Sequence, residues 1–315
     1  MKVRTVLGDV PPSALGRTLC HEHLLVHYRK SPRLESVFFR MFRRAVYPML
    51  EAMKRGGGNA FVEATPIMPT RYPALWQEVS RRSGIHIIAS TGAYVERHIP
   101  PSFRKMGADE IAGVMSSEVR KGMDGTNIRA GIIKLASGGL GAIRTPHGVK
   151  PGFGPTEGKF FRAAIVVHRE LGVPITTHAY PGLACQVQFF AKNRVDLAGV
   201  SVGHLEVCTW FDIIEAARSG IGLAFTNLGG EDDIPEDVEV QQIAWLARHG
   251  YRDQITLSTD QALMVDEKRR RLSRHFPVGY DHVYRVTVPK LMAAGLKARD
   301  VDRMLIDNPR RYLAF

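Results

Sequence analysis

The sequence predicts one α/β domain over residues 1–315, a (β/α)8 barrel in which each of eight parallel strands is followed by a helix. Three observations predict it. Short apolar runs recur eight times, amphipathic stretches separate them, and histidines or an aspartate stand at the C-terminal ends of several runs. A length of 315 residues suits a barrel of roughly 250 residues with insertions. An open doubly wound sheet is the alternative, but no Gly-x-Gly-x-x-Gly follows the first run.

The predicted strands are rich in β-branched residues and almost continuously apolar. This pattern is typical of parallel strands that are covered on both faces. The eight strands are Thr18–Leu25, Asn59–Thr65, Ile85–Thr91, Arg129–Ala136, Pro174–His178, Val200–His204, Ile221–Thr226 and Gln254–Ser258.

Helical periodicity lies between the strands, and several of these stretches end near a glycine. The clearest are Ala108–Met123, Thr156–Leu171, Trp210–Ser219 and Pro235–Arg248. Three long connections, or extended loops, follow strands 1, 4 and 8, and they are Val26–Tyr47, Ser137–Thr156 and Gln261–Tyr280. Because all three follow strands, they are expected on the barrel face that carries active sites. Apolar residues of the first loop are expected to form a contact surface or a substrate lid, namely Phe38, Phe39, Met41 and Phe42.

The composition fits a soluble globular protein, and we expect it in the cytoplasm. No apolar run approaches the ~20 residues of a membrane helix, and the N-terminus lacks the apolar core of a secretion signal. Three widely spaced cysteines give no disulfide framework. The net charge is +12, with basic clusters in Arg29–Arg55 and Lys268–Arg274. Neither cluster matches a nucleic-acid motif, so they indicate a solvated surface or attraction of an acidic substrate.

His21-Glu22-His23 is the strongest local signal. Residues i and i+2 of a strand point the same way, so His21 and His23 share one side of the sheet. Two imidazoles that converge on one point suit a divalent metal ion. Glu22 then faces the opposite side and needs a partner of its own.

Three further polar residues end apolar strands. His178 ends strand 5, His204 ends strand 6 and Asp260 follows strand 8. Each is placed where a barrel builds its active site. A single such histidine is more often structural, but this many polar side chains in one layer would cost several kcal/mol if they were buried unpaired.

Lys134 lies inside strand 4, between apolar neighbours. A buried ammonium group is costly, so the amine is expected to be neutralised. A salt bridge, a depressed pKa for Schiff-base chemistry, or carbamylation by CO2 would each achieve this. The surrounding histidines favour the carbamate, because two cations need an anionic ligand.

This set of residues resembles the phosphotriesterase family of the amidohydrolase superfamily, which includes the phosphotriesterase-like lactonases. The resemblance spans the whole chain, and the matching segments are Gly16–Leu24, Gly131–Lys134, Pro174–His178, Gly203–His204, Ser258–Asp260 and Asp307–Tyr312.

The resemblance implies a metal-dependent hydrolase with two metal ions. By it, His21, His23 and Asp260 hold one ion, and His178 and His204 hold the other. Carbamylated Lys134 and a hydroxide bridge the two ions, and Asp260 orients the hydroxide and removes its proton. Zinc is favoured, and cobalt, manganese and iron are alternatives. The resemblance also implies a homodimer as an assembly to test.

Substrate choice is expected to depend on the loops. Tyr94 after strand 3 resembles a tyrosine that the lactonases carry near their metals, and Tyr180 and Arg144 are further candidates for substrate contacts. One departure concerns strand 7, where the lactonases often carry an aspartate followed by Arg or His. Here Ala224-Phe225 stand in that region.

The leading hypothesis is hydrolysis of a carboxylic ester, above all a lactone, by the bridging hydroxide, with weak phosphotriesterase activity. The close alternative is amide hydrolysis of N-acyl amino acids by the same metal chemistry. A different class is an inactive metal-binding barrel, or a nucleic-acid-binding barrel suggested only by the charge. We therefore expect a small-molecule substrate and neither nucleic acid nor membrane as a partner.

Overall fold

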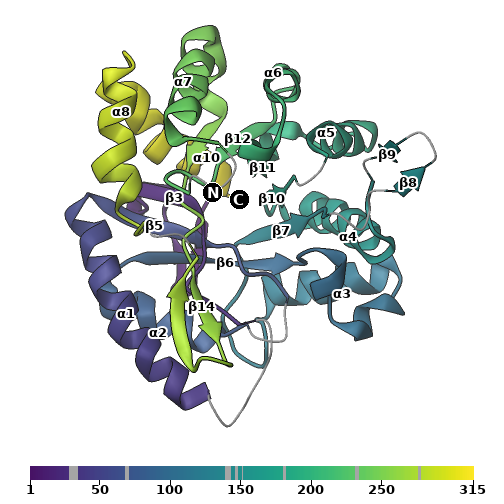
Figure 1. Cartoon of the computed structure of the whole chain (residues 1–315). Coiled ribbons are helices and arrows are strands. Elements are labelled where there is room, and N and C mark those ends of the chain that lie inside the picture. Colours follow the sequence, from purple (N-terminus) through teal and green to yellow (C-terminus); the bar gives the residue numbers. More distant parts are fainter. Residues whose placement is uncertain are drawn as a thin grey trace.

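The computed structural model contains one central ring of eight parallel strands surrounded by helices (Figure 1). It describes residues 1–27, 35–67, 71–138, 143–145, 148–150, 152–179, 182–230, 234–275 and 278–315, with backbone alone for 143–145 and 148–150. Within these residues, no helix is long and apolar enough to span a membrane.

The ring confirms the predicted (β/α)8 barrel and excludes the open doubly wound sheet. Every neighbouring pair in the order β13-β12-β11-β10-β7-β6-β5-β3 is parallel. The strands are β3 (Arg17–Glu22), β5 (Gly58–Glu63), β6 (His86–Gly92), β7 (Ile132–Ala136), β10 (Ile175–His178), β11 (Val200–Gly203), β12 (Gly222–Phe225) and β13 (Ile255–Leu257). Each lies within one of the eight predicted strands or extends it by a single residue.

Among the described residues, one α-helix lies in each connection between consecutive barrel strands, and three more follow the last strand. They are α1 (Glu35–Arg55), α2 (Pro73–Ser83), α3 (Ala108–Arg120), α4 (Pro155–Leu171), α5 (Leu183–Lys192), α6 (Trp210–Arg218), α7 (Glu236–Leu246), α8 (Val288–Ala293), α9 (Ala298–Asp302) and α10 (Asn308–Leu313). The two termini meet, because Lys2 and Phe315 exchange two backbone hydrogen bonds of 3.1 and 3.0 Å.

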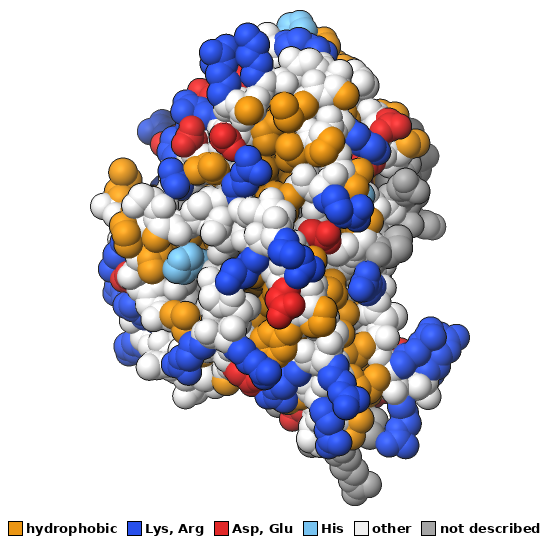
Figure 2. Space-filling view, turned by 90° about the vertical axis from the view of Figure 1, so that its left-hand side faces the viewer, with side chains coloured by type: hydrophobic (Ala, Val, Ile, Leu, Met, Phe, Trp, Pro, Cys, Tyr) orange, Lys and Arg blue, Asp and Glu red, His pale blue; other side chains and the backbone are white. Residues whose placement is uncertain are grey.

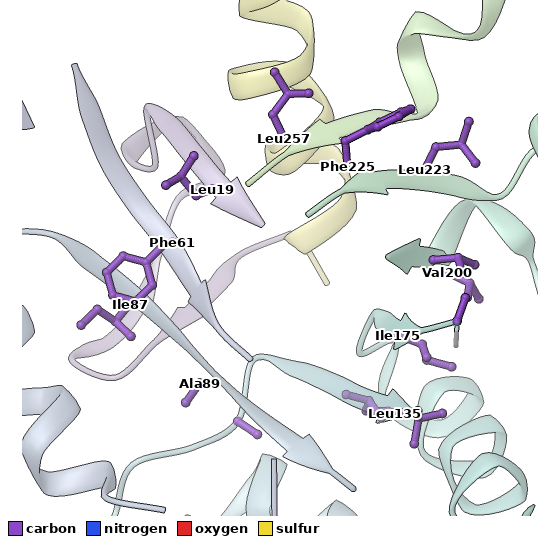
Figure 3. Close-up of a cluster of buried hydrophobic side chains, with 14 of the residues drawn as sticks. Leu19, Phe61, Ile87, Ala89, Leu135, Ile175, Val200, Leu223, Phe225 and Leu257 are labelled. Carbon is purple, nitrogen blue, oxygen red and sulfur yellow. The ribbon is translucent and has the colours of Figure 1, made fainter. Parts of the chain in front are cut away.

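The main core lies between the strands and the helices. Side chains labelled in Figure 3 come from all eight barrel strands and point away from the centre of the ring, as Leu19, Ile175 and Leu257 do. They pack against apolar helix residues such as Phe160 and Ile243. Side chains alternate along a strand, so the residues between these apolar ones point into the barrel interior. The polar groups of the site occupy such inward positions at the strand ends.

The predicted first long loop is wrong over most of its length. Residues 35–55 form helix α1, because apolar side chains recur every three or four positions and cover one face. Phe38 and Phe42 are 2% and 0% exposed and belong to the core, so they do not form a surface contact or a lid. The many basic residues on the other face of α1 had hidden this periodicity.

The connection after β13 contains a hairpin made of β14 (Leu263–Asp266) and β15 (Arg271–Arg274). Strand β14 also pairs in parallel with β4 (Leu25–Val26), which follows β3. The loops after strands 1 and 8 are therefore joined in one small sheet beside the barrel opening (Figure 1).

Two further short antiparallel strand pairs and several 3-10 turns lie outside the eight barrel strands. β1 (Val3–Thr5) pairs with β2 (Gly8–Val10), and β8 (Ile143–Thr145) pairs with β9 (Gly148–Lys150) in the connection after β7. Short 3-10 turns occur at Pro12–Ala14, Glu96–His98, Pro101–Arg104, Leu197–Gly199, Leu205–Val207 and Arg252–Gln254.

Candidate metal centre

The predicted polar residues meet in one pocket at the C-terminal ends of the barrel strands. The pocket has a volume of about 110 Å³. Its lining residues are His21, His23, Val26, Thr65, Pro66, Tyr94, Lys134, His178, His204, Asp260, Ala262, Met264 and His275.

His21, His23 and Asp260 form the tightest group. The two histidines stand at and just after the end of β3, and Asp260 follows β13. Asp260 Oδ1 lies 3.2 Å from His23 Nε2 and 3.6 Å from His21 Nε2. One potential ligand atom from each of the three residues lies within 4.8 Å of the other two, so one cation could contact all of them.

His178 and His204 form the other side of the cluster. Their ring centroids are 3.8 Å apart, and His204 Nε2 lies 3.7 Å from Asp260 Oδ2. Lys134 Nζ lies between the two groups, 3.0 Å from His21 Nε2. The side chain of Lys134 therefore points into the barrel, as its place within an apolar strand required.

Backbone strain accompanies this arrangement. His204 has φ of 61° and Asp260 has φ of 50°, both in the left-handed region that side chains other than glycine rarely adopt. Gly92 at the end of β6 has φ of 103°, and a Cβ there would lie 2.1 Å from the Lys134 carbonyl oxygen. Strain of this kind persists where surrounding contacts hold it, and such positions concentrate at functional sites.

Side chains behind the cluster orient the imidazoles, and sequence reasoning missed them. His23 Nδ1 lies 2.7 Å from Thr65 Oγ1, and His204 Nδ1 lies 2.8 Å from Glu206 Oε1. Glu63 Oε1 lies 3.7 Å from His23 Nδ1. Histidines that bind metals usually have such partners for their second nitrogen. The sequence did offer a signal for the two glutamates: Glu63 lies near the end of a predicted strand, and Glu206 stands two positions after His204.

Burial and the charges of neighbouring groups shift the pKa values of several pocket residues. Burial lowers the pKa of Lys134 to about 7, and burial with nearby positive groups moves the pKa of His21 and His178 well below the usual range. Burial alone would raise the pKa of Asp260, but its contact with His23 and the neighbouring histidine charges lower it to about 2. Burial alone would lower the pKa of His23, but its contacts with Asp260 and Glu63 raise it to about 9. The site thus presents one carboxylate, neutral imidazoles at His21 and His178, and a protonated His23 that must release its proton to bind a cation.

This donor set fits divalent cations. Neutral imidazoles and a carboxylate are ligands that zinc and its neighbours in the transition series accept. Asp260 Oδ1 is buried and makes no hydrogen bond within the part of the chain that the structure describes, although buried carboxylate oxygens are normally satisfied. A cation between Asp260 and the two histidines of β3 would satisfy it.

Two further polar side chains line the pocket near this cluster. The Tyr94 ring lies 5.6 Å from His178 in an edge-on arrangement and stacks at 5.6 Å on His98. His275, at the end of the β14–β15 hairpin, adds positive charge that helps to lower the pKa of Asp260. Sequence reasoning had singled out Tyr94 but not His275.

Two candidate substrate residues cannot be located. Tyr180 lies outside the described residues, and so does the side chain of Arg144. The interpretation of Ala224-Phe225 as a replaced loop pair needs correction. Both residues lie within β12, and Phe225 packs into the core outside the ring (Figure 3). The segment after β12 begins with Thr226 and Asn227, so Ala224 and Phe225 do not occupy the loop that follows this strand.

The basic residues do not gather into one stripe on the face shown in Figure 2, where Lys and Arg side chains alternate with apolar and neutral surface. On the β14–β15 hairpin, Arg269 and Arg271 lie 3.3 and 3.7 Å from Asp266. The positive charge is thus dispersed on this face and partly neutralised on the hairpin.

Comparison with known proteins agrees with the pocket. The model of the phosphotriesterase family matches residues 1–313. An N-acetyltaurine hydrolase from Tetraodon nigroviridis is 30% identical over 359 aligned positions, which cover 100% of this chain and 98% of the relative. The N-acetyltaurine hydrolase of Homo sapiens is 27% identical, with the same coverage.

Solved structures show the same architecture. An organophosphorus hydrolase from Deinococcus radiodurans, carrying one substitution, superposes with a TM-score of 0.85 at 28% identity, covering 100% of this chain and 98% of that one. A variant of a PTE-like lactonase from the same organism gives 0.84 at 28% identity, covering 99% and 100%.

Proposed function

The chain belongs to the phosphotriesterase family and is a metal-dependent hydrolase, and from that premise we propose that it cleaves the amide bond of N-acyl amino acids or similar N-acylated amines that carry an acidic group. The observation that carries the proposal is the end-to-end similarity to proteins named N-acetyltaurine hydrolase, an activity on an N-acylated amino acid. The amide reading thus gains support over the lactone reading that the sequence alone favoured.

The family is binuclear, and the pocket residues suit two cations. His21, His23 and Asp260 would hold one, and His178 and His204 the other, with Lys134 between the two groups. Zinc is the proposed ion because the ligands are imidazole and carboxylate. Two such cations would lower the pKa of a water molecule and polarise the substrate carbonyl, whose carbon that water attacks.

Lys134 is proposed to carry a carbamate. Its lowered pKa of about 7 leaves much of the amine neutral at physiological pH, and a neutral amine is the form that reacts with CO2. Nζ forms a bond to the carbon of CO2 and releases a proton, which leaves an anionic group in place of a buried ammonium. The carbamate would add a second anionic ligand to the site. Among the described residues that line the pocket, Asp260 is the one with a carboxylate.

Two pocket residues are proposed to act during amide cleavage. Asp260 orients the attacking water and carries its proton toward the nitrogen that leaves when the C–N bond breaks. Tyr94, beside His178, would hydrogen-bond the substrate or the developing negative charge. Tyr180 and Arg144 remain proposals for substrate contacts.

The acidic end of the substrate is proposed to lie toward the β14–β15 hairpin. The pocket wall there combines apolar Ala262 and Met264 with the imidazole of His275. The exposed bases Lys268 and Arg270 lie in the turn of this hairpin and Arg274 ends its second strand, and all three would attract an anion toward the opening.

A direct test is to incubate the zinc-loaded enzyme, prepared with bicarbonate, with N-acetyl amino acids, N-acetyltaurine and a panel of lactones. We expect release of the free amine, and loss of that release in Asp260→Asn. Lactone turnover with no amine release from any N-acyl substrate would contradict the amide proposal.

Lactone hydrolysis is the second candidate. It is supported by the structural neighbour named a PTE-like lactonase and by the position of Tyr94 in the pocket. The same panel distinguishes the two activities through kcat/KM, and a paraoxon-like triester measures any weak phosphotriesterase activity.

A further inference from the structure

Glu22 stands between the two histidines of β3 but points away from the pocket. Its side chain is 0% exposed. Oε1 accepts a hydrogen bond of 2.8 Å from the backbone N–H of Thr259, and Oε2 accepts one of 2.8 Å from the backbone N–H of Gln261. The Thr259 hydroxyl donates a further bond of 2.9 Å to Oε2. The partner that the sequence required for Glu22 is therefore the pair of residues on either side of Asp260.

These contacts hold residues 259–261 in a backbone conformation that is unfavourable without them. Asp260 has φ of 50°, which costs free energy for any side chain other than glycine. One carboxylate binds the amides immediately before and after it. The contact also has no local origin, because Glu22 and Gln261 are 239 residues apart.

The same contacts close the barrel at its metal end. β3 and β13 are the two ends of the strand order. His21 N donates to Ser258 Oγ at 2.8 Å, and His23 N donates to the Gln261 carbonyl at 2.9 Å. Glu22 lies between these two bonds. Hydrogen bonds of three successive residues, 21 to 23, therefore join the end of β3 to the segment after β13.

We propose that Glu22 is a positioning residue that sets the separation of His21 and His23 from Asp260 and thereby fixes the geometry of one metal site. It touches neither the pocket nor the substrate. Its effect passes through the backbone of residues 259–261, and the second group, His178 and His204, stands on strands that Glu22 does not contact. The inference rests on the metal dependence of the family.

Glu22→Gln tests the proposal with almost no change in volume. A glutamine amide has one oxygen and one NH2, whereas both backbone N–H groups of the segment need an acceptor. One N–H must then face a donor, and the segment shifts. Replacing a residue that orients a metal ligand typically lowers the affinity for the metal ion by about 10–100-fold. We expect this loss for one of the two zinc ions and wild-type affinity for the other.

Zinc content per chain is measured by mass spectrometry during titration with a chelator, together with the melting temperature of the metal-free protein. Thr259→Val keeps both backbone donors and removes only the hydroxyl bond, so it should weaken the same ion by a smaller factor. Glu118→Gln is the matched control, because Glu118 is a buried glutamate that accepts from Arg71 and Thr91 away from the pocket.

Selective loss of one ion in Glu22→Gln, with both ions retained in Glu118→Gln at a similar melting temperature, supports the proposal. Wild-type affinity for both ions in Glu22→Gln, or equal weakening of both, overturns it. If Glu22→Gln does not fold, an unchanged zinc affinity in Thr259→Val overturns it instead. Wild-type protein that binds zinc but hydrolyses no amide would contradict the proposed function and leave this test intact.

Discussion

Glu239 on α7, which does not line the pocket, gives a prediction about stability. Its side chain is 2% exposed, and its Oε1 makes no hydrogen bond among the described residues. Burial, with the negative charges of Glu206 and Glu236, raises its pKa from 4.5 to about 8. Folding therefore favours the protonated form, and the unfolded chain favours the carboxylate.

The sign and size of the effect follow from this shift. A pKa raised on folding contributes stability that is fully present below pH 4.5 and is lost as the pH rises through about 8. The full difference corresponds to on the order of 5 kcal/mol. Glu239→Gln removes the charge but keeps the shape, so the variant should gain stability over the wild type between pH 6 and 9 and match it near pH 5.

The assay is thermal or urea unfolding at fixed zinc concentration across this pH range, followed by circular dichroism. Glu236→Gln on the same helix is the control of opposite sign. Burial alone would raise the pKa of Glu236, but hydrogen bonds from His282, Lys290 and Thr287 outweigh it and lower the pKa to about 2. That variant should lose stability at neutral pH. A Glu239→Gln protein less stable than the wild type at pH 8–9 would refute the reasoning.

Three predictions concern the site. Lys134→Ala should lower kcat by more than about 100-fold, which exceeds the effect of replacing a residue that only orients a metal ligand. Intact mass measured under mild conditions should show the added CO2 on the wild type and not on the variant. Wild-type protein that binds zinc without this added mass would contradict the carbamate. Asp260→Asn should lower kcat by about 100- to 10,000-fold with folding intact, and a loss below tenfold would remove Asp260 from proton transfer. His275→Ala should raise KM about tenfold for an N-acyl amino acid and leave its neutral methyl ester unchanged, since one charge-assisted hydrogen bond is lost; an equal change for both would exclude anion recognition.

The barrel could be predicted from the sequence because its signals are local. Eight apolar runs, each a few residues long, mark the strands, and chain order alone places their C-terminal ends in one layer. Lys134 was informative for the same reason, since a lysine within an apolar strand requires a special environment. Helix α1 was missed because basic residues on its exposed face obscured the apolar positions that pack inward.

The second layer of the site could not be predicted, because it depends on contacts across long stretches of chain. Glu22 meets Thr259 and Gln261 only after the barrel closes, and Thr65 reaches His23 from a different strand. His275 enters the pocket through a hairpin whose position depends on pairing between β14 and β4. Sequence spacing carries no information about such pairs.

The most direct test of the two-metal hydrolase is anomalous diffraction from crystals of the zinc-loaded protein, recorded on both sides of the zinc absorption edge. The account predicts two peaks in the pocket, one beside His21, His23 and Asp260 and one beside His178 and His204, with Lys134 between them. A single peak, or none among these residues, would contradict it.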